Sequence, residues 1–254
     1  MTELLQVNHL SKRYPGFTLQ DISFSVKPGR IMGLIGKNGA GKSTTLKSIL
    51  NMVRSESGTV TMLGKDFYAN EKECKQDIGV VFGGIDFYPL KKLSAITAVT
   101  RRFYKDWDQE RYNDYLRQFS LDENKQFRSL SNGMKVKYLL ALALSHHATL
   151  YLLDEPTSGL DPVSRDEILH IFTRIVKDGK RSVLFSTHIT SDLDRCADDI
   201  TYIQNGKVLQ SADKDTFLHS FEHLKTTEDT SPLTLEEIML AYIERRRGNV
   251  DSFN

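Results

Sequence analysis

The chain has 254 residues, of which 39% are hydrophobic and 26% are charged, and its formal net charge is +1. This composition is ordinary for a soluble globular protein, and no apolar run approaches the roughly 20 residues that cross a bilayer. The charge balance creates no general attraction for nucleic acid or acidic lipid, so we expect no nucleic-acid partner. Two distant cysteines, Cys74 and Cys196, predict reduced thiols in a cytosolic protein that is not exported.

Short strands dominate the first third of the chain. Turn signals at Pro15-Gly16 and Pro28-Gly29 separate the first three strands, and Gly83-Gly84 ends the last. The predicted strands are residues 4–7, 22–26, 31–35, 59–63 and 78–82. Residues from about 93 to 148 are then predicted to be helical, because apolar side chains recur there at helical spacing.

Strands and helices alternate in the remaining part of the chain. Strands are predicted at residues 150–153, 183–186, 202–204 and 208–210, and Asn205-Gly206 predicts a hairpin between the last two. Asp161 and Pro162 begin a helix that ends near Gly179. A final helix begins at Thr234, which has capping-box spacing to Glu237. This alternation predicts an α/β protein with a mostly parallel sheet.

A glycine-rich loop connects the strand at 31–35 to a helix. Its backbone N–H groups and the helix N-terminus are suited to a phosphate, Lys42 can reach the β/γ oxygens, and Ser43 can ligate Mg²⁺. We therefore predict ATP and Mg²⁺ as ligands. The predicted nucleotide-binding residues in this loop are Gly36, Asn38, Gly39, Ala40, Gly41, Lys42, Ser43 and Thr44.

An acidic pair ends the strand at 150–153. Asp154 is a candidate for the Mg²⁺ shell, and Glu155 is a candidate to polarise the attacking water. Such a pair can also simply cap the next helix. Its combination with Lys42 favours hydrolysis of the bond to the γ-phosphate of ATP.

The segment Leu130-Ser131-Asn132-Gly133-Met134-Lys135 resembles the signature motif of the ATP-binding cassette (ABC) family, with Asn132 and Met134-Lys135 as variants. The resemblance extends from Leu4 to about Gln210. It implies a P-loop NTPase (RecA-like) core with a mixed sheet, a small antiparallel β subdomain and an inserted α-helical subdomain. It also implies an ABC ATPase domain at residues 1–220, with the helical insert at about 87–149, and a helical tail at 221–254.

The resemblance also assigns further site residues. Ser131 and Gly133 would close over an ATP held by Lys42 of a second ATPase subunit, a homodimer partner or a close relative. Asp161 resembles the loop that crosses that interface, although its simpler role is a helix N-cap. His188 resembles the switch histidine at the γ-phosphate, and Tyr14 matches the aromatic position that stacks on adenine. The predicted catalytic residues are therefore Glu155, His188 and Lys42.

One position departs from the family pattern. The strand at 78–82 should lead to a glutamine that touches Mg²⁺ and senses the membrane partner, and the aligned position holds Gly83. Either Asp86 or a water molecule substitutes for it, or coupling to the membrane partner is looser than usual. Candidate contacts for a membrane permease are residues 86–89 and Phe103-Tyr104, in a groove between the helical insert and the core.

The overall likeness is to single-cassette bacterial efflux ATPases for drugs, peptides or sodium. It predicts an ATP-hydrolysing subunit that drives a separate integral-membrane permease, and a cytoplasmic chain held peripherally at the inner face of the cell membrane. Two alternatives are a soluble ABC ATPase that serves a non-membrane assembly, and a P-loop kinase or GTPase that acts alone. The last alternative leaves Ser131 without a function.

Overall fold

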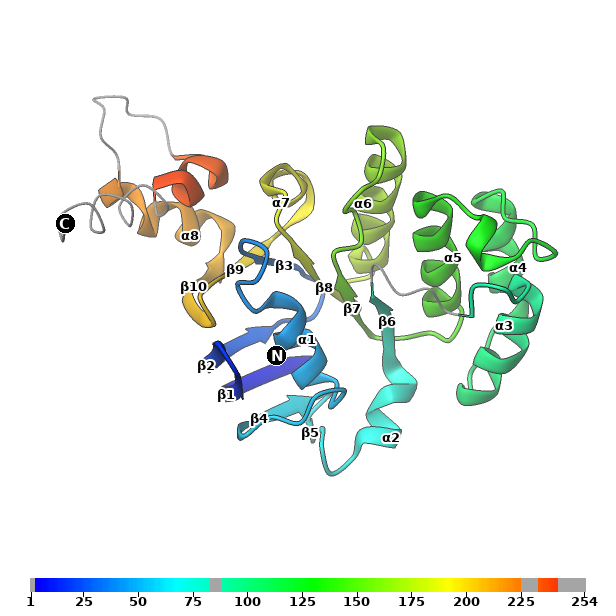
Figure 1. Ribbon diagram of the computed structural model, residues 1–254, viewed down its shortest axis with the longest axis horizontal. Coiled ribbons are helices and arrows are strands. Elements are labelled where there is room, and N and C mark those ends of the chain that lie inside the picture. Colours follow the sequence, from blue (N-terminus) through cyan, green and yellow to red (C-terminus); the bar gives the residue numbers. More distant parts are fainter. Residues whose placement is uncertain (1–2, 83–87, 225–232, 242–254) are drawn as a thin grey trace.

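Two β-sheets organise the chain, and the computed structural model describes residues 3–82, 88–224 and 233–241. The strands of a small antiparallel sheet are β1 (Leu5–Tyr14), β2 (Phe17–Val26), β4 (Ser57–Met62) and β5 (Lys65–Asp66). The strands of a larger sheet are β3 (Ile31–Ile35), β6 (Ile78–Phe82), β7 (Leu150–Asp154), β8 (Ser182–Thr187), β9 (Asp199–Gln204) and β10 (Lys207–Asp213). Figure 1 shows both sheets.

The larger sheet is mixed, as expected. Its strand order is β10-β9-β3-β8-β7-β6. Neighbouring strands from β9 to β6 are parallel, whereas β10 pairs antiparallel with β9. The prediction of a mostly parallel sheet is confirmed, and the hairpin predicted at Asn205-Gly206 adds its antiparallel edge.

The side chains of β3 alternate between two hydrophobic cores. Ile31 and Ile35 belong to one core, and Met32 and Leu34 belong to the other, as the two-residue period of a strand requires. Helix α1 (Lys42–Ile49) packs in the core of Met32 and Leu34, together with the antiparallel sheet. Helices α5 (Asn132–Leu144) and α6 (Pro162–Val176) pack in the other core. Helix α1 therefore covers the opposite face of the sheet from α5 and α6.

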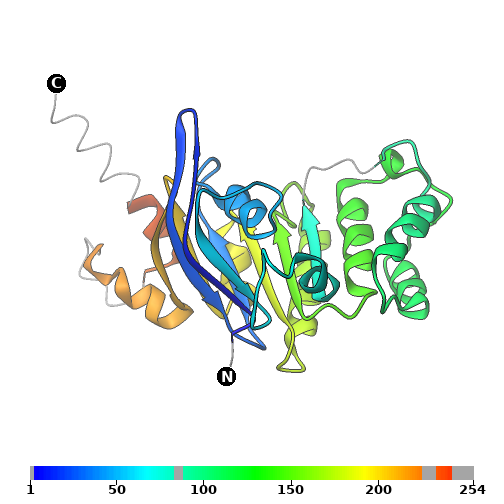
Figure 2. The ribbon, with the colours of Figure 1, turned by 90° about the horizontal axis from the view of Figure 1, so that it is seen from below.

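A helical subdomain lies at the end of the molecule opposite the antiparallel sheet, as Figure 2 shows. It contains α3 (Leu93–Thr100), α4 (Gln109–Gln118) and α5, with 3-10 turns η2 (Arg101–Phe103) and η3 (Phe127–Ser129). Thr97 Oγ1 lies 2.7 Å from the hydroxyl of Tyr112 and 2.9 Å from that of Tyr138, and this buried network joins all three helices. The expected helical insert is confirmed, but turns interrupt it. Its limits at 87 and 149 stay a prediction.

Several elements differ from the sequence predictions. Strands β1 and β2 are 10 residues each rather than the expected 4–7 and 22–26, because they pair from Leu5 and Val26 to Tyr14 and Phe17. Hydrogen bonds between the two strands extend both of them through polar residues, whose sequence pattern alone does not predict a strand. The structure adds the short helices α2 (Glu71–Cys74), η1 (Lys75–Asp77), α7 (Thr190–Cys196), α8 (Lys214–Ser220) and η4 (Glu222–Leu224).

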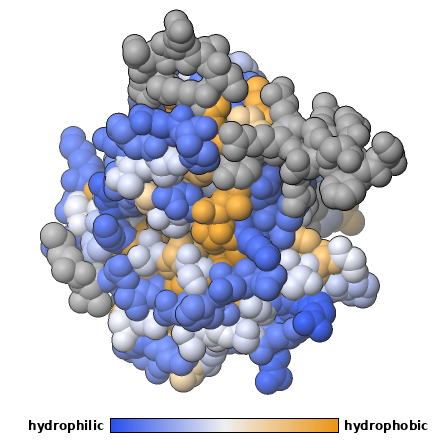
Figure 3. Space-filling model, turned by 90° about the vertical axis from the view of Figure 1, so that its left-hand side faces the viewer, coloured by the Kyte–Doolittle hydropathy of each residue, from blue (hydrophilic) through white to orange (hydrophobic). Residues whose placement is uncertain are grey.

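The C-terminal part packs on the same core as α5 and α6. Leu235 and Ile238, in a helical segment at 235–241, are buried in the same hydrophobic core as Phe217 and Phe221. The side of the molecule that carries α8 and β10 is largely hydrophilic around a small apolar area (Figure 3). A boundary at residue 220 stays a prediction. Within the described ranges, every helix is too short or too polar to cross a bilayer.

Candidate active site

The loop between β3 and α1 has the backbone shape of a phosphate cradle. Gly39 and Gly41 have φ angles of 79° and 117°, which residues with a side chain rarely adopt. The N–H of Ala40 donates to the oxygen of Lys37 at 3.0 Å, and the N–H of Gly206 donates to the oxygen of Ala40 at 2.9 Å. The turn between β9 and β10 therefore supports the loop from behind, a role that sequence reasoning did not give to Asn205-Gly206.

Lys42 is buried within this loop. Its Nζ donates to the carbonyl oxygens of Gly36 at 2.7 Å and Lys37 at 3.3 Å, and it lies 3.0 Å from Oε1 of Glu155. The ammonium group is thus fixed on the inner side of the loop. A phosphate bound there would compete with Glu155 for this charge.

Ser43 and Asp154 lie next to each other, as predicted. Ser43 Oγ donates to Asp154 Oδ1 at 2.9 Å, and Ser186 Oγ donates to the same oxygen at 2.6 Å. A hydroxyl and a carboxylate fit the oxygen preference of Mg²⁺. The described residues contain no group of three or more His, Cys, Asp or Glu side chains that could hold a metal. The other ligands of Mg²⁺ here would come from nucleotide phosphates and water, as is usual for this ion.

Glu155 contacts both other predicted catalytic residues. Its Oε2 lies 2.8 Å from Nδ1 of His188, and its Oε1 faces Lys42. Its φ angle of 49° is unusual for a residue with a side chain. Two bonds from its N–H hold this conformation, one to Ser186 Oγ at 2.9 Å and one to Ser186 O at 3.2 Å.

Ser131 and Asp161 are the N-caps of α5 and α6, two helices whose first turns lie close together. Ser131 Oγ accepts from the N–H of Met134 at 3.2 Å, and Asp161 Oδ1 accepts from the N–H of Ser164 at 3.0 Å. Hydrogen bonds from Ser164 lower the pKa of Asp161. A Cβ on Gly133 would lie 3.0 Å from Ser164 Oγ, so α5 and α6 begin in direct contact. These caps satisfy their own helices, and their role toward a second subunit stays a prediction.

Tyr14 ends β1 at the tip of the long hairpin with β2. The residue is 36% exposed, and Lys12 Nζ lies 5.5 Å from the centroid of its ring. An exposed aromatic ring at the tip of a hairpin is available for stacking. Its role in binding adenine stays a prediction.

The expected permease contacts are only partly described. Gly83 and Asp86 lie outside the described residues. Tyr88 and Phe103 are exposed, whereas the ring of Tyr104 stacks on His146 with centroids 3.7 Å apart. Beside Tyr104 lies an apolar cavity of 320 Å³ between the central sheet and the helical subdomain. It is lined by Met52, Val80, Phe82, Ile96, Thr100, Tyr104, Leu139, Leu142 and Ala143.

Sequence reasoning missed the polar side chains behind Glu155 and His188. Ser186 bonds both Asp154 and the backbone of Glu155, while Asp192 accepts a bond from Thr157 at 2.6 Å and pairs with Arg165. No local motif marks these partners, because they come from separate segments. The only feature of the sequence that could have indicated them is a polar residue near the end of an apolar strand, such as Ser186.

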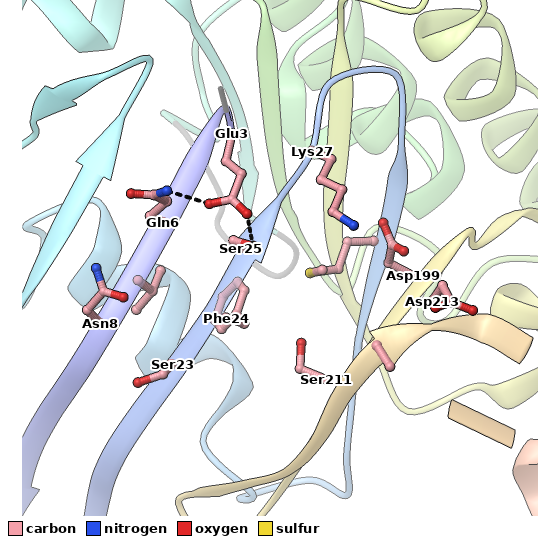
Figure 4. Close-up of a pocket in the computed structure, with 13 residues that line it drawn as sticks. Glu3, Gln6, Asn8, Ser23, Phe24, Ser25, Lys27, Asp199, Ser211 and Asp213 are labelled. Atoms are coloured by element: carbon pink, nitrogen blue, oxygen red, sulfur yellow. Dashed lines mark hydrogen bonds between the residues drawn. The ribbon is translucent and has the colours of Figure 1, made fainter. Parts of the chain in front are cut away.

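A second cavity, of 460 Å³, lies between β1 and β2 on one side and β10 on the other (Figure 4). Its lining includes Glu3, Lys27 and Asp199 but none of the sequence-predicted site residues. Glu3 accepts a bond from Ser25 at 2.8 Å, and Asp199 accepts from Arg30 Nε at 2.9 Å. These two acids therefore already have partners within the chain.

Comparison with known proteins agrees with this arrangement. Residues 19–158 match the family model described as ABC transporter, so the chain belongs to the ABC transporter family. The bacitracin transport ATP-binding protein BcrA of Bacillus licheniformis is 29% identical over 228 residues, 89% of this chain and 72% of BcrA. The Nod factor export ATP-binding protein I of Ralstonia nicotianae is 31% identical over 227 residues, 86% of this chain and 70% of that protein.

A solved ATP-binding subunit of an ABC transporter superposes with a TM-score of 0.80 at 27% identity, covering 95% of this chain and 98% of that one. The chain is thus an ATP-binding subunit of the ABC transporter type with the ABC ATPase fold. Its likeness to single-cassette efflux ATPases, expected from the sequence, is confirmed.

Proposed function

We propose that this chain hydrolyses ATP and drives a separate membrane permease that exports its substrate. The observation that carries this proposal is the contact of Glu155 with both Lys42, at 3.0 Å, and His188, at 2.8 Å, beside the Ser43–Asp154 pair. The lysine proposed to bind phosphate, the candidate base and the candidate metal ligands thus lie next to one another at the same edge of the sheet.

The chain's own residues suggest the division of work in hydrolysis. The loop N–H groups and Lys42 bind the β- and γ-phosphates, while Ser43 and Asp154 would hold Mg²⁺, whose charge would offset that of the phosphate oxygens. Glu155 orients the attacking water and accepts its proton. His188, bonded to Glu155, positions that carboxylate toward the γ-phosphate. Tyr14 stacks on the adenine.

The partner of this chain in ATP binding is a second ATPase subunit, the same chain or a close relative. Ser131, Gly133 and Asp161 lie at the starts of α5 and α6, and α1 packs on the other face of the sheet. A second copy in head-to-tail orientation would bring such helix starts to the γ-phosphate on Lys42. Helix N-termini favour anions, which supports this use.

The name of one relative, the Nod factor export ATP-binding protein I, supports export as the direction. The permease would dock at the apolar cavity between the central sheet and α5. The chain would then be cytoplasmic and held at the inner face of the membrane through that permease. Its net charge of +1 supports a protein partner rather than nucleic acid.

The substitution Glu155→Gln tests the proposed hydrolysis. It removes the candidate base but leaves Lys42 and the loop, so we expect turnover to fall about 10²–10⁴-fold while ATP still binds. The measurement is phosphate release together with the equilibrium binding of ATP. As a matched control, Glu110→Gln changes an exposed glutamate on α4 and should leave turnover unchanged.

The same variant tests the paired arrangement. Saturated with ATP and Mg²⁺, the Glu155→Gln protein is expected to run as a dimer in size-exclusion chromatography, since hydrolysis no longer opens it. A chain that stays monomeric at high concentration would contradict the proposed pairing. Turnover that survives the substitution would remove Glu155 from the role of base.

A further inference from the structure

One buried carboxylate touches three segments around the active site. Asp192, on α7, is fully buried. Its Oδ2 accepts a hydrogen bond from Thr157 Oγ1 at 2.6 Å and a longer one from Thr187 Oγ1 at 3.5 Å. Its Oδ1 accepts a bond from Nε of Arg165, near the start of α6.

The partners of Asp192 are close in sequence to the predicted site residues. Thr157 follows Glu155 by two positions, and Thr187 directly precedes His188. Arg165 lies one turn after Asp161 and bonds its carbonyl oxygen through a backbone N–H at 3.0 Å. Asp192 itself touches none of Lys42, Glu155 and His188 in the bonds described, so it can act on them only through these neighbours.

Hydrogen bonds hold the loop from Glu155 to Asp161 at its start, its middle and its far end. The N–H of Glu155 is fixed by Ser186, and the middle of the loop is fixed where Thr157 donates to Asp192. The far end enters α6, where Arg165 also pairs with Asp192 and donates to Ser191 Oγ at 2.6 Å. The two oxygens of a single carboxylate thus connect the middle and the end of this loop.

The turn that carries His188 is connected to the same carboxylate. Thr187 Oγ1 accepts from the N–H of Ile189 at 3.0 Å, which closes the turn over His188. Hydrogen bonds in a water-free interior are strong and geometrically demanding, and a buried charge needs all of its partners. Movement of Asp192 would therefore displace the turn of His188 and the loop of Glu155 together.

We infer that Asp192 is a positioning residue for hydrolysis: it holds the loop of Glu155 and Asp161 and the turn of His188 in one arrangement through Thr157, Arg165 and Thr187. This inference rests on the proposed function. It adds a residue, outside the motifs, that sets the distance between the base and the γ-phosphate.

The substitutions Asp192→Asn and Thr157→Val test the inference. Asn keeps the shape of Asp, but its NH₂ group replaces one acceptor oxygen and faces a donor, either Thr157 or Arg165. Val keeps the shape of Thr but lacks the hydroxyl group that donates to Asp192. We expect each to lower kcat about 10–100-fold, as displaced catalytic geometry does. KM for ATP should change little, because the phosphate loop is not altered. Thr157→Ser, which keeps the hydroxyl, should restore most of the turnover.

The double variant Asp192→Asn with Thr157→Val should be no slower than the slower single variant, since both remove the same hydrogen bond. In a Glu155→Gln background, neither substitution should lower the residual turnover further. Asp194→Asn is the matched control on the exposed side of the same helix. Thermal unfolding of every variant shows whether it is folded. If Asp192→Asn does not fold, the turnover of Thr157→Val alone tests the positioning role.

Three results would overturn the inference: kcat unchanged in folded Thr157→Val, a rise of KM with kcat unchanged, or losses that multiply in the double variant. Failure of the proposed function has a different signature. If Glu155→Gln keeps full turnover, the base is wrongly assigned whatever Asp192 does. If Glu155→Gln is inactive while the Thr157 and Asp192 variants turn over normally, only the positioning role fails.

Discussion

Gly36 lets the backbone of the phosphate loop pack directly against the backbone of the central sheet. A Cβ at this position would lie 2.3 Å from the carbonyl oxygen of Ile203, a backbone atom of β9. Real Cβ atoms do not approach an oxygen so closely, so any larger residue must move the loop or β9. Gly36 is therefore needed for close packing of two backbones, whereas Gly39 and Gly41 are needed for their φ angles.

The substitution Gly36→Ala tests this role. We expect it to lower the free energy of unfolding by about 1–3 kcal/mol, as overpacking does, and to weaken ATP binding because the loop shifts away from β9. Urea denaturation and ATP titration measure the two effects. Gly64→Ala is the control: φ is +77° there and nothing lies within 4 Å of the added Cβ, so it should cost stability without affecting ATP. Normal ATP affinity in Gly36→Ala would argue against the clash.

The sequence was sufficient to name the candidate site residues that lie in local motifs. Lys42 and Ser43 lie in a recognisable loop, and Asp154 and Glu155 end an apolar strand. Their partners could not be found in this way. Ser186 and Asp192 act through hydrogen bonds to segments about 30 or more residues away. Such contacts depend on the order of strands in the sheet, which residue patterns do not specify.

At the scale of elements, the end of α5 is joined to the start of β6 by one buried histidine. His146 Nε2 lies 3.1 Å from the oxygen of Ile78, and Nδ1 lies 3.3 Å from the oxygen of Leu142. The ring also stacks on Tyr104. Burial lowers the pKa of His146, against the opposing effect of these two carbonyl oxygens and Asp77. Burial therefore favours the neutral form of this histidine where the helical subdomain meets the central sheet.

This lowered pKa predicts a pH dependence of stability. As pH falls below about 6.5, the ordinary pKa of histidine, the unfolded chain binds a proton at this residue before the folded chain does. Stability is therefore present above this pH and is lost as pH falls toward the lower pKa of the folded state. We expect the free energy of unfolding to fall less between pH 7.5 and 5.5 in His146→Gln than in the wild type. Denaturant titrations at both pH values measure it, and parallel losses would contradict it.

Strands with a strongly apolar sequence could be predicted, whereas the parts of strands that depend on hydrogen bonds to a partner strand could not. β3, β6 and β7 lie where expected, and Asp154 at the end of β7 is their only charged residue. β1 and β2 extend far beyond their apolar cores, because each supplies hydrogen-bond partners for the other. The seven-residue helix α7 has too few turns to show a helical period.

At the scale of the whole molecule, the strand order brings the site together. β3, β8 and β7 are adjacent and parallel, so the loops that follow them leave the same edge of the sheet. These loops carry Lys42, His188 and Glu155. Ligands of open parallel sheets bind at this edge. The alternation of strands and helices predicted a parallel sheet, but only the structure shows that these three strands are neighbours.

We propose that a permease senses this site at the apolar cavity between the central sheet and the helical subdomain. Phe82, at the end of β6, lines it, and β6 pairs along its length with β7, which ends at Asp154. A segment inserted beside Phe82 is thus one strand away from the candidate metal ligand. Met52 lies at the rim of the cavity and is 54% exposed.

The substitution Met52→Glu tests docking at this cavity. A carboxylate would have to be buried without a partner when an apolar segment docks, so we expect rebinding to membranes stripped of the wild-type chain to fall by about tenfold or more. The ATPase rate of the isolated chain should stay normal, because Met52 lies outside the phosphate loop. Leu240→Glu is the matched control, since Leu240 is 50% exposed but lies on the C-terminal helical segment. Equal loss of rebinding in both variants would mean that added charge alone weakens the association, and normal rebinding of Met52→Glu would place the permease elsewhere.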